Sequence, residues 1–208
     1  NAGTAVRFGS CLSLLLAHPL VIDGDDHMRQ RPIGALSTSL RHLGVSVEHL
    51  ERDGCPPLSL RRTHQPPTEV EIDVSLSSQY ASGLLMVAPR LEQGLTVKLT
   101  TPDNTPLVSM PYVEMTLSMM QSAGAQIDRP SEDIIIVAAG GYHAGPEPRR
   151  VAIESDWSAA AFLLAAGEIM GDDEVPCTFP PPTYACPQFD VPGAGFIHIA
   201  AYIEDCNA

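Results

Sequence analysis

The sequence contains two segments that share one plan and lie about eighty residues apart. The first reads RPIGALSTSLRHLGVSVEHL from Arg31, and the second reads MPYVEMTLSMMQSAGAQI from Met110. Pro32 lies 79 residues before Pro111, and Gly44 lies 80 residues before Gly124. A period of this length indicates that one supersecondary unit is built twice, so any fold must accommodate two similar units side by side.

Each segment predicts a helix followed by strands. A proline suited to the first helical turn is followed by apolar residues at helical spacing, and a glycine is placed to end the helix. The apolar positions are Ile33, Leu36, Leu40 and Leu43 in the first segment and Tyr112, Met115, Met119 and Ala123 in the second. The strands expected after them are 45–50 and 58–60, and 125–128 and 134–138.

A further helix precedes each segment, opened by a loop of small polar residues. Gly3 and Thr4 precede an apolar stretch at 7–17, and Ser77 to Gln79 precede one at 80–88. Residues 95–100 around Lys98 alternate as in a half-exposed strand. A third opening of the same kind, 155–158, leads into an apolar stretch at 159–170.

These elements predict an α/β (α+β) fold of repeated βαβαββ units. We expect two near-complete units in residues 1–152, followed by the start of another. The polar loops at the helix N-termini are then expected to converge. Free backbone N–H groups and the helix dipole favour anions at such a place.

Composition excludes several classes of function. The formal net charge of −13, from 25 acidic and 12 basic residues, argues against a nucleic-acid surface. The 5 cysteines include no CxxC pair, so neither a disulfide framework nor a metal site is indicated, and a reducing compartment such as the cytosol or a plastid fits best. No apolar stretch reaches the roughly 20 residues of a membrane span. The chain begins at Asn1 without the pattern of a signal peptide, and we expect it to be a fragment.

Two segments offer cationic groups for anions. In NAGTAVR, Gly3 permits close backbone approach and Arg7 lies within the first turns; the alternative is a helix cap formed by Thr4. In DGDDHMRQRPIG, Arg29 and Arg31 present planar forks that match carboxylate or phosphate. The alternative there is a pair of surface arginines that neutralise Asp25 and Asp26.

Neutral hydrogen-bonding groups occupy the other helix starts. SLSSQY supplies Ser77, Ser78 and Gln79, although either serine could act only as a cap. SMPY supplies Ser109 and Tyr112, and core packing is the alternative for Tyr112. In ESDWSAA, Asp156 lies near a helix start, where a carboxylate can also be a simple dipole partner. No zinc-hydrolase or serine-hydrolase motif is present.

Taken together, NAGTAVR, MRQRPIG, SSQY with LLMVAP, SMPYVEMT and ESDWSAA resemble the enolpyruvylshikimate-phosphate synthase family over roughly residues 1–175. The resemblance implies a fold of two domains of the inside-out barrel type, each with three βαβαββ units. Residues 1–152 would then be two units of one domain, 153–175 the start of the second domain, and 176–208 a divergent proline-rich tail. It implies transfer of the enolpyruvyl group of phosphoenolpyruvate to the 5-hydroxyl of shikimate 3-phosphate, without a cofactor.

The resemblance also implies roles for individual residues. Phosphoenolpyruvate would contact Gly3, Arg31 and Gln79, and Thr4 and Arg7 would also belong to the substrate-binding residues. Shikimate 3-phosphate would contact Ser77, Ser78, Gln79, Ser109 and Tyr112, and Asp156 matches a position near the domain crossover with a catalytic role.

Other groups that the family's reaction needs have no match in the chain. We therefore expect a fragment that is inactive alone and is completed by a complementary chain or a missing second domain. Two alternatives remain: a non-catalytic anion-binding module derived from such an enzyme, and a sister enolpyruvyl transferase acting on a nucleotide sugar.

Overall fold

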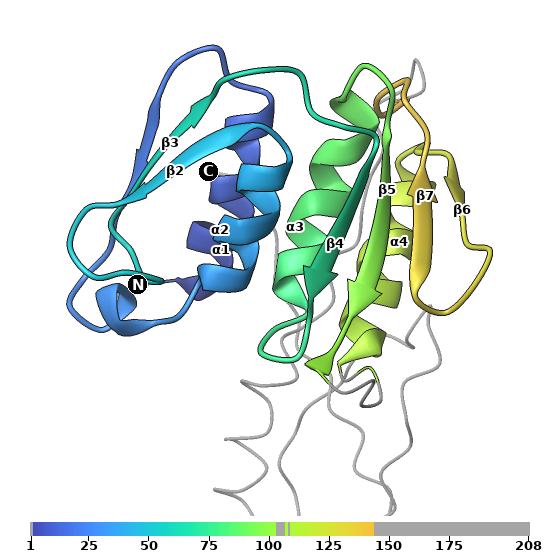
Figure 1. Cartoon of the computed structure of the whole chain (residues 1–208). Helices are drawn as coiled ribbons and strands as arrows, with labels where there is room; N and C mark the ends of the chain where they lie inside the picture. The colour runs from blue at the N-terminus through green and yellow to red at the C-terminus, as the bar shows by residue number, and fades with distance from the viewer. Residues whose placement is uncertain (1, 103–106, 108, 144–208) are drawn as a thin grey trace, which may run out of the picture. The chain divides into compact units, whose positions relative to one another are not determined.

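The computed structural model describes residues 2–102, 107 and 109–143, which belong to one compact unit, Asn1–Pro148. This unit contains two sheets with helices packed on them (Figure 1). The predictions for 153–175 and 176–208, and for the stretch 155–170 within them, lie outside the described residues.

The elements follow the order expected for two related repeats. The first repeat comprises α1 (Gly3–Cys11), the 3-10 turn η1 (Leu12–Leu14), β1 (Leu20–Ile22), η2 (Met28–Gln30), α2 (Gly34–His42), β2 (Val45–His49) and β3 (Leu58–Arg62). The second comprises β4 (Glu69–Asp73), α3 (Gln79–Val87), η3 (Ala88–Arg90), β5 (Leu95–Thr100), α4 (Met110–Ser122), β6 (Ile127–Asp128) and β7 (Ile134–Val137).

Sheet topology confirms the internal repeat. The first sheet has the strand order β1-β3-β2, and the second has the order β4-β5-β7-β6. Each neighbouring pair in β1-β3-β2 and in β5-β7-β6 is antiparallel, so the three strands of the first sheet correspond one by one to three strands of the second. Strand β4 joins the second sheet in parallel with β5. The combination of helices with an antiparallel and a mixed sheet confirms the expected α/β (α+β) class.

The helices of the two repeats pack on one another. A Cβ atom added at Gly83 of α3 would lie 2.8 Å from the sulfur of Cys11 in α1, so these two helices approach closely. Helix α2 contacts strand β4 of the other repeat, where Ser39 Oγ donates a 2.7 Å hydrogen bond to the carbonyl of Glu71. One hydrophobic cluster includes buried residues from both repeats.

Both predicted helix stops are confirmed. Gly44 and Gly124 follow α2 and α4 with φ angles of +82° and +91°, a backbone conformation that side chains with a Cβ rarely adopt. Their N–H groups donate to the carbonyls of Arg41 and Gln121, which satisfies acceptors left open at the helix ends.

Two helix starts differ from the sequence prediction. Helix α1 begins at Gly3 and ends at Cys11, whereas 7–17 was expected; Ala2 is its N-cap, and Thr4 lies inside the first turn instead of capping. Helix α2 begins at Gly34, with Ile33 as N-cap. Pro32 therefore lies before the helix and not in its first turn, and the N–H of Ile33 donates to the carbonyl of Gly54.

The buried face of α4 also differs from the prediction. Tyr112, Met115 and Met119 are 62%, 55% and 62% exposed, whereas Val113 and Leu117 are buried. Both sets have helical spacing, so the pattern alone could not decide between them. In the first repeat, by contrast, all four predicted apolar positions of the corresponding segment are buried. No described helix is long and apolar enough to cross a membrane.

Candidate functional site

Several helices begin at the same end of this unit. Parallel strands β4 and β5 run in the same direction, and each leads through a loop into a helix, α3 and α4. Figure 1 shows that the N-terminal ends of α1, α2, α3 and α4 all lie at its lower edge. The first backbone N–H groups of these helices lack intrahelical acceptors, so this end offers donors to anions.

A hydrogen-bond network joins the start of α1 to the start of α3. Arg7 Nη1 donates to Gln79 Oε1 over 2.8 Å and to Ser77 Oγ over 3.3 Å. Gln79 Nε2 in turn donates to Thr4 Oγ1 over 3.1 Å. Thr4 and Arg7 of the first repeat therefore form one polar cluster with Ser77 and Gln79, which follow seventy or more positions later in the sequence. Ser77 Oγ also accepts from the N–H of Gln79, so Ser77 both belongs to the cluster and caps α3 locally.

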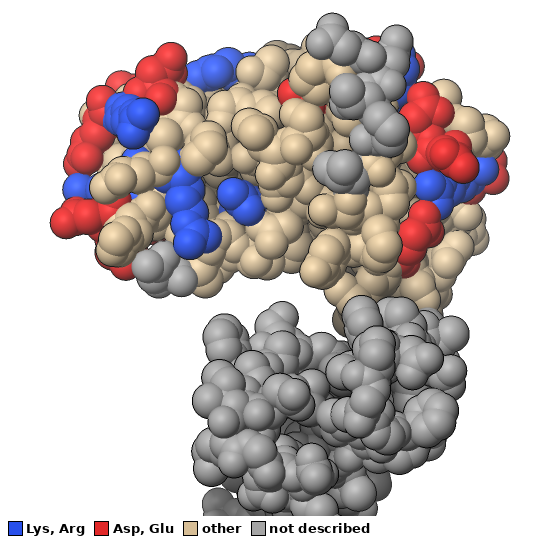
Figure 2. All heavy atoms as spheres, turned by 90° about the horizontal axis from the view of Figure 1, so that it is seen from below, with Lys and Arg blue, Asp and Glu red and all other residues tan. Residues whose placement is uncertain are grey.

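Arg31, from the segment before α2, lies next to the start of α1 as well. A Cβ atom at Gly3 would lie 3.0 Å from Arg31 Nη1 and 3.9 Å from Arg7 Nη1, so the two guanidinium groups flank the start of α1. Among the described residues, no carboxylate pairs with Arg31. Figure 2 looks onto this end of the molecule, where cationic side chains lie among uncharged residues and acidic ones gather nearer the edges. Two close cations without a carboxylate between them favour an anionic ligand.

Tyr80 lies beneath this cluster and was not singled out by the sequence. Its side chain is 1% exposed, and its hydroxyl donates a 2.7 Å hydrogen bond to the carbonyl of Pro32. The guanidinium carbon of Arg7 lies 5.3 Å from the centre of its ring. Burial raises the pKa of Tyr80, opposed in part by the charge of Arg7, so the phenol remains a hydrogen-bond donor at neutral pH. The sequence signal that could have identified Tyr80 as part of the site is its position next to Gln79.

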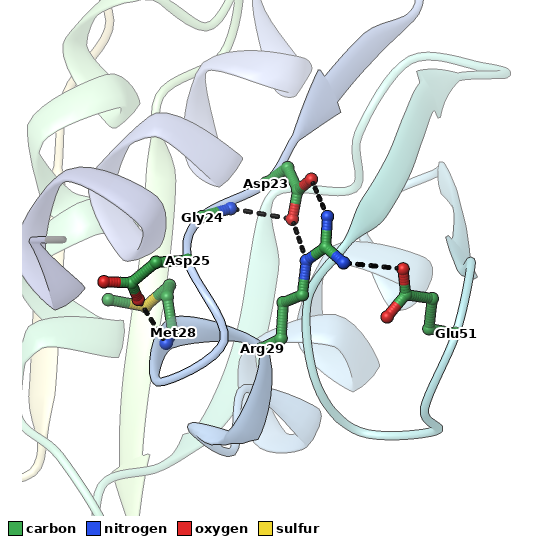
Figure 3. Close-up of polar contacts among 6 residues, drawn as sticks. All are labelled: Asp23, Gly24, Asp25, Met28, Arg29 and Glu51. Atoms are coloured by element: carbon green, nitrogen blue, oxygen red, sulfur yellow. Dashed lines mark hydrogen bonds and ion pairs between the residues drawn. The ribbon is translucent and has the colours of Figure 1, made fainter.

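Arg29 lies between two carboxylates, as Figure 3 shows. Its guanidinium pairs with Asp23 at 2.6 Å and with Glu51 at 2.9 Å. The side-chain hydrogen bond from Arg29 holds the pKa of Asp23 below its usual value. Arg29 is thus a surface arginine paired with carboxylates, but its partners are not the expected Asp25 and Asp26. Asp25 Oδ1 instead accepts from the N–H of Met28.

The remaining predicted residues lie near these helix starts without joining the network. Ser78 is buried at the N-cap of α3, and its side chain makes no capping hydrogen bond. Ser109 is exposed at the N-cap of α4 with a φ angle of +59°. Tyr112 is exposed, so the alternative of core packing is wrong for it. Within the described part of the chain, no hydrogen bond links Ser109 or Tyr112 to Arg7.

One connection brings α4 alongside the cluster. Ser82 Oγ, three residues into α3, and Thr116 Oγ1, six residues into α4, are 3.0 Å apart. The N-termini of α3 and α4 are therefore neighbours, and Ser109 lies at the same end as Gln79. Asp156 lies outside the described residues.

The fold and the cluster define the chain as part of an α/β repeat protein with paired arginines at converging helix N-termini. A sequence profile described as EPSP synthase (3-phosphoshikimate 1-carboxyvinyltransferase) matches residues 1–181. The chain therefore belongs to the EPSP synthase family.

Relatives agree with this assignment. The chain is 40% identical over 175 residues to the 3-phosphoshikimate 1-carboxyvinyltransferase of Shewanella sediminis, and 35% identical over 178 residues to that of Actinobacillus pleuropneumoniae. These matches cover 83% and 84% of this chain and 39% and 40% of the relatives. A solved EPSP synthase from Acinetobacter baumannii superimposes with a TM-score of 0.60 at 25% identity, covering 81% of this chain and 35% of that structure. The chain thus spans about two fifths of the length of the curated relatives it matches.

Proposed function

We propose that this chain forms part of the substrate-binding surface of an enzyme that transfers the enolpyruvyl group of phosphoenolpyruvate to shikimate 3-phosphate. The observation that supports this most directly is the convergence of Arg7, Arg31 and Gln79 on the start of α1. The curated relatives, named 3-phosphoshikimate 1-carboxyvinyltransferase, support the same activity.

Each substrate carries negative charges that match these groups. We assign the anionic groups of phosphoenolpyruvate to Arg31, to the backbone at Gly3 and to Gln79. The absent side chain at Gly3 leaves the room that the Arg31 guanidinium occupies. Each charge-assisted hydrogen bond contributes about 1.5–3 kcal/mol.

Shikimate 3-phosphate is assigned to the neutral donors at the starts of α3 and α4. These are Ser77, Ser78, Gln79, Ser109 and Tyr112, five residues that lie at one end of neighbouring helices. Hydroxyl and amide groups suit a ligand with several hydroxyls, because they both donate and accept.

Turnover needs more than these groups supply. The reaction requires a proton donor for the enol carbon and an acceptor for the hydroxyl proton. Lys98, the only lysine of the chain, pairs with Glu71 over 2.8 Å on the β4–β5 surface, and its side-chain hydrogen bond to Glu71 raises its pKa. Lys98 therefore suits a structural ion pair better than a base. We propose that Asp156 and groups outside this chain complete the catalytic site. We also propose that the enzyme acts in the cytosol or in a plastid.

Matched arginine variants test the binding surface. In calorimetry with shikimate 3-phosphate and phosphoenolpyruvate, Arg31→Met should weaken binding of phosphoenolpyruvate at least about tenfold, because one charge-assisted contact is removed. Arg29→Met, two positions away, should leave binding unchanged because Arg29 pairs with Asp23 and Glu51. Equal effects of both variants, or no binding to the unmodified chain at millimolar ligand, would rule the proposal out.

Two further measurements separate the alternatives. Supplying the remaining part of a relative and following phosphate release distinguishes an enzyme fragment, which gains turnover, from a non-catalytic binding module, which gains none. Competition between shikimate 3-phosphate and a nucleotide sugar distinguishes the sister transferase. The Ser77–Ser78–Gln79 loop favours the shikimate substrate.

A further inference from the structure

Tyr80 connects the two arginines of the candidate site, although they come from different parts of the first repeat. Its side chain, on α3 of the second repeat, is almost fully buried at 1% exposure. One end of the side chain reaches the backbone next to Arg31, and its ring lies under the guanidinium of Arg7. A single aromatic side chain therefore contacts the support of both cations.

The backbone around Arg31 is held by a small number of hydrogen bonds. The N–H of Arg31 donates to the carbonyl of Met28, and the N–H of Ile33 donates to the carbonyl of Gly54 over 2.8 Å. Pro32 has no N–H, so its carbonyl is its only polar backbone group. That carbonyl accepts the 2.7 Å hydrogen bond from the Tyr80 hydroxyl. This bond ties the Arg31–Pro32 segment to the second repeat.

Arg7 depends on Tyr80 in another way. Its guanidinium carbon lies 5.3 Å from the ring centre, within the range in which a cation is attracted to an aromatic face. The same guanidinium donates to Gln79, the residue before Tyr80. The ring and the amide together fix the position of the Arg7 group.

We propose that Tyr80 is a positioning residue for anion binding: its hydroxyl sets the Arg31 segment, and its ring face sets Arg7, without contact with the ligand. This inference rests on the proposed function for its ligand, because the arginines matter only if they bind one. Tyr80→Phe separates the two contributions, since phenylalanine keeps the ring under Arg7 and removes the donor to Pro32.

Ligand-free measurements test the inference independently of binding. In nitrogen-15 relaxation of the arginine side chains of the full chain, Tyr80→Phe should increase the mobility of the Arg31 Nε–H group while Arg7 keeps its order. Tyr80→Leu should increase both. The control is Tyr142→Phe, which removes a similar phenol bond, 2.8 Å to the carbonyl of Met86, away from both arginines. Unchanged Arg31 mobility in Tyr80→Phe would overturn the inference.

A double-mutant cycle provides the second test. Tyr80→Phe should weaken phosphoenolpyruvate binding about fivefold, the size of one net hydrogen bond, and should add nothing once Arg31 is methionine. An additive loss would show that Tyr80 acts only through general stability, and would overturn the inference. If the unmodified chain binds no phosphoenolpyruvate, the proposed function fails, while the relaxation data still decide whether Tyr80 positions Arg31.

Discussion

Gly3 lies where the first turn of α1 meets the guanidinium of Arg31. A Cβ atom there would come within 3.0 Å of Arg31 Nη1, the tip of a flexible side chain. The side chain can move away at little cost to folding, so the position affects the placement of a cation more than it affects stability.

Gly3→Ala should therefore lower phosphoenolpyruvate affinity about tenfold through displacement of Arg31, with the free energy of unfolding changed by no more than about 0.5 kcal/mol. Gly34→Ala is the matched control, since Gly34 also begins a helix and an added Cβ would lie 3.8 Å from its nearest neighbour. Calorimetry and urea unfolding of both variants check this. Loss of affinity in Gly34→Ala as well would contradict the proposed geometry.

The two arginines of MRQRPIG show the limit of sequence reasoning at single positions. Arg29 and Arg31 have the same chemistry and lie two residues apart, so composition favours neither as a ligand. Arg29 pairs with Asp23, six positions before it, and with Glu51, which the fold brings from 22 positions away. Tyr80 was missed for the same reason, because its partner Pro32 is 48 positions distant.

At the scale of elements, the contact of α1 with α3 depends on a missing side chain. A Cβ atom at Gly83 would lie 2.8 Å from Cys11 Sγ and 3.5 Å from the carbonyl of Arg7. The distance to the carbonyl is an ordinary van der Waals contact, so the clash is with the Cys11 sulfur. Because Cys11 is fully buried, its short side chain has little room to turn away, and a larger residue at position 83 would strain the contact between the helices.

We expect Gly83→Ala to destabilise the protein by about 1–2 kcal/mol, because overpacking outweighs the better helix propensity of alanine. Gly9→Ala, inside α1, should be neutral or stabilise by up to about 1 kcal/mol, since its Cβ would make an ordinary 3.4 Å contact with Ile22. Urea unfolding of the pair measures the difference. Equal stability of the two variants would disprove the tight contact.

The exposed and buried faces of α4 give a second element-level prediction. Leu117→Ala should cost about 2–4 kcal/mol by leaving a cavity, whereas Met115→Ala should change stability by less than about 0.5 kcal/mol. Leu117 is 5% exposed and Met115 is 55% exposed. Thermal unfolding checks both. The opposite order would restore the face expected from the sequence.

Local signals predicted some elements well and others poorly. Gly44 and Gly124 marked helix ends correctly because a positive φ is a local property of the chain. The alternation around Lys98 predicted β5 for a similar reason, since every second side chain is buried. The prediction of the buried face of α4 was wrong because two sets of apolar residues, one beginning at Tyr112 and one at Val113, both have helical spacing. Only the packing of α4 on α3 and the sheet determines which set is buried.

At the scale of the described molecule, reduced contact with water opposes the ionisation of several groups. Burial raises the pKa values of Tyr80 and the Cys11 thiol, and partial burial raises the pKa of Tyr142. The unfolded chain loses these protons at lower pH than the folded one. Once the pH rises past the pKa values of the unfolded chain, the folded state therefore binds more protons. The slope of the unfolding free energy with pH is then negative.

Stability should therefore be fully present below about pH 8.5, where unfolded thiols begin to ionise, and should fall progressively as the pH rises past the unfolded tyrosine value of about 10. Urea midpoints measured across this range check the sign. The double variant Tyr80→Phe, Tyr142→Phe should show a shallower decline. A midpoint that rises with pH would contradict the burial of these groups.

Cys11 has a practical consequence for studies of how the repeats come apart. Its sulfur has no exposed surface and faces Gly83 across the α1–α3 contact. An alkylating reagent needs the ionised thiolate and free access, and the close-packed helices deny it both. The rate of labelling at Cys11, located by peptide mass mapping, would therefore report the rate at which α1 and α3 separate.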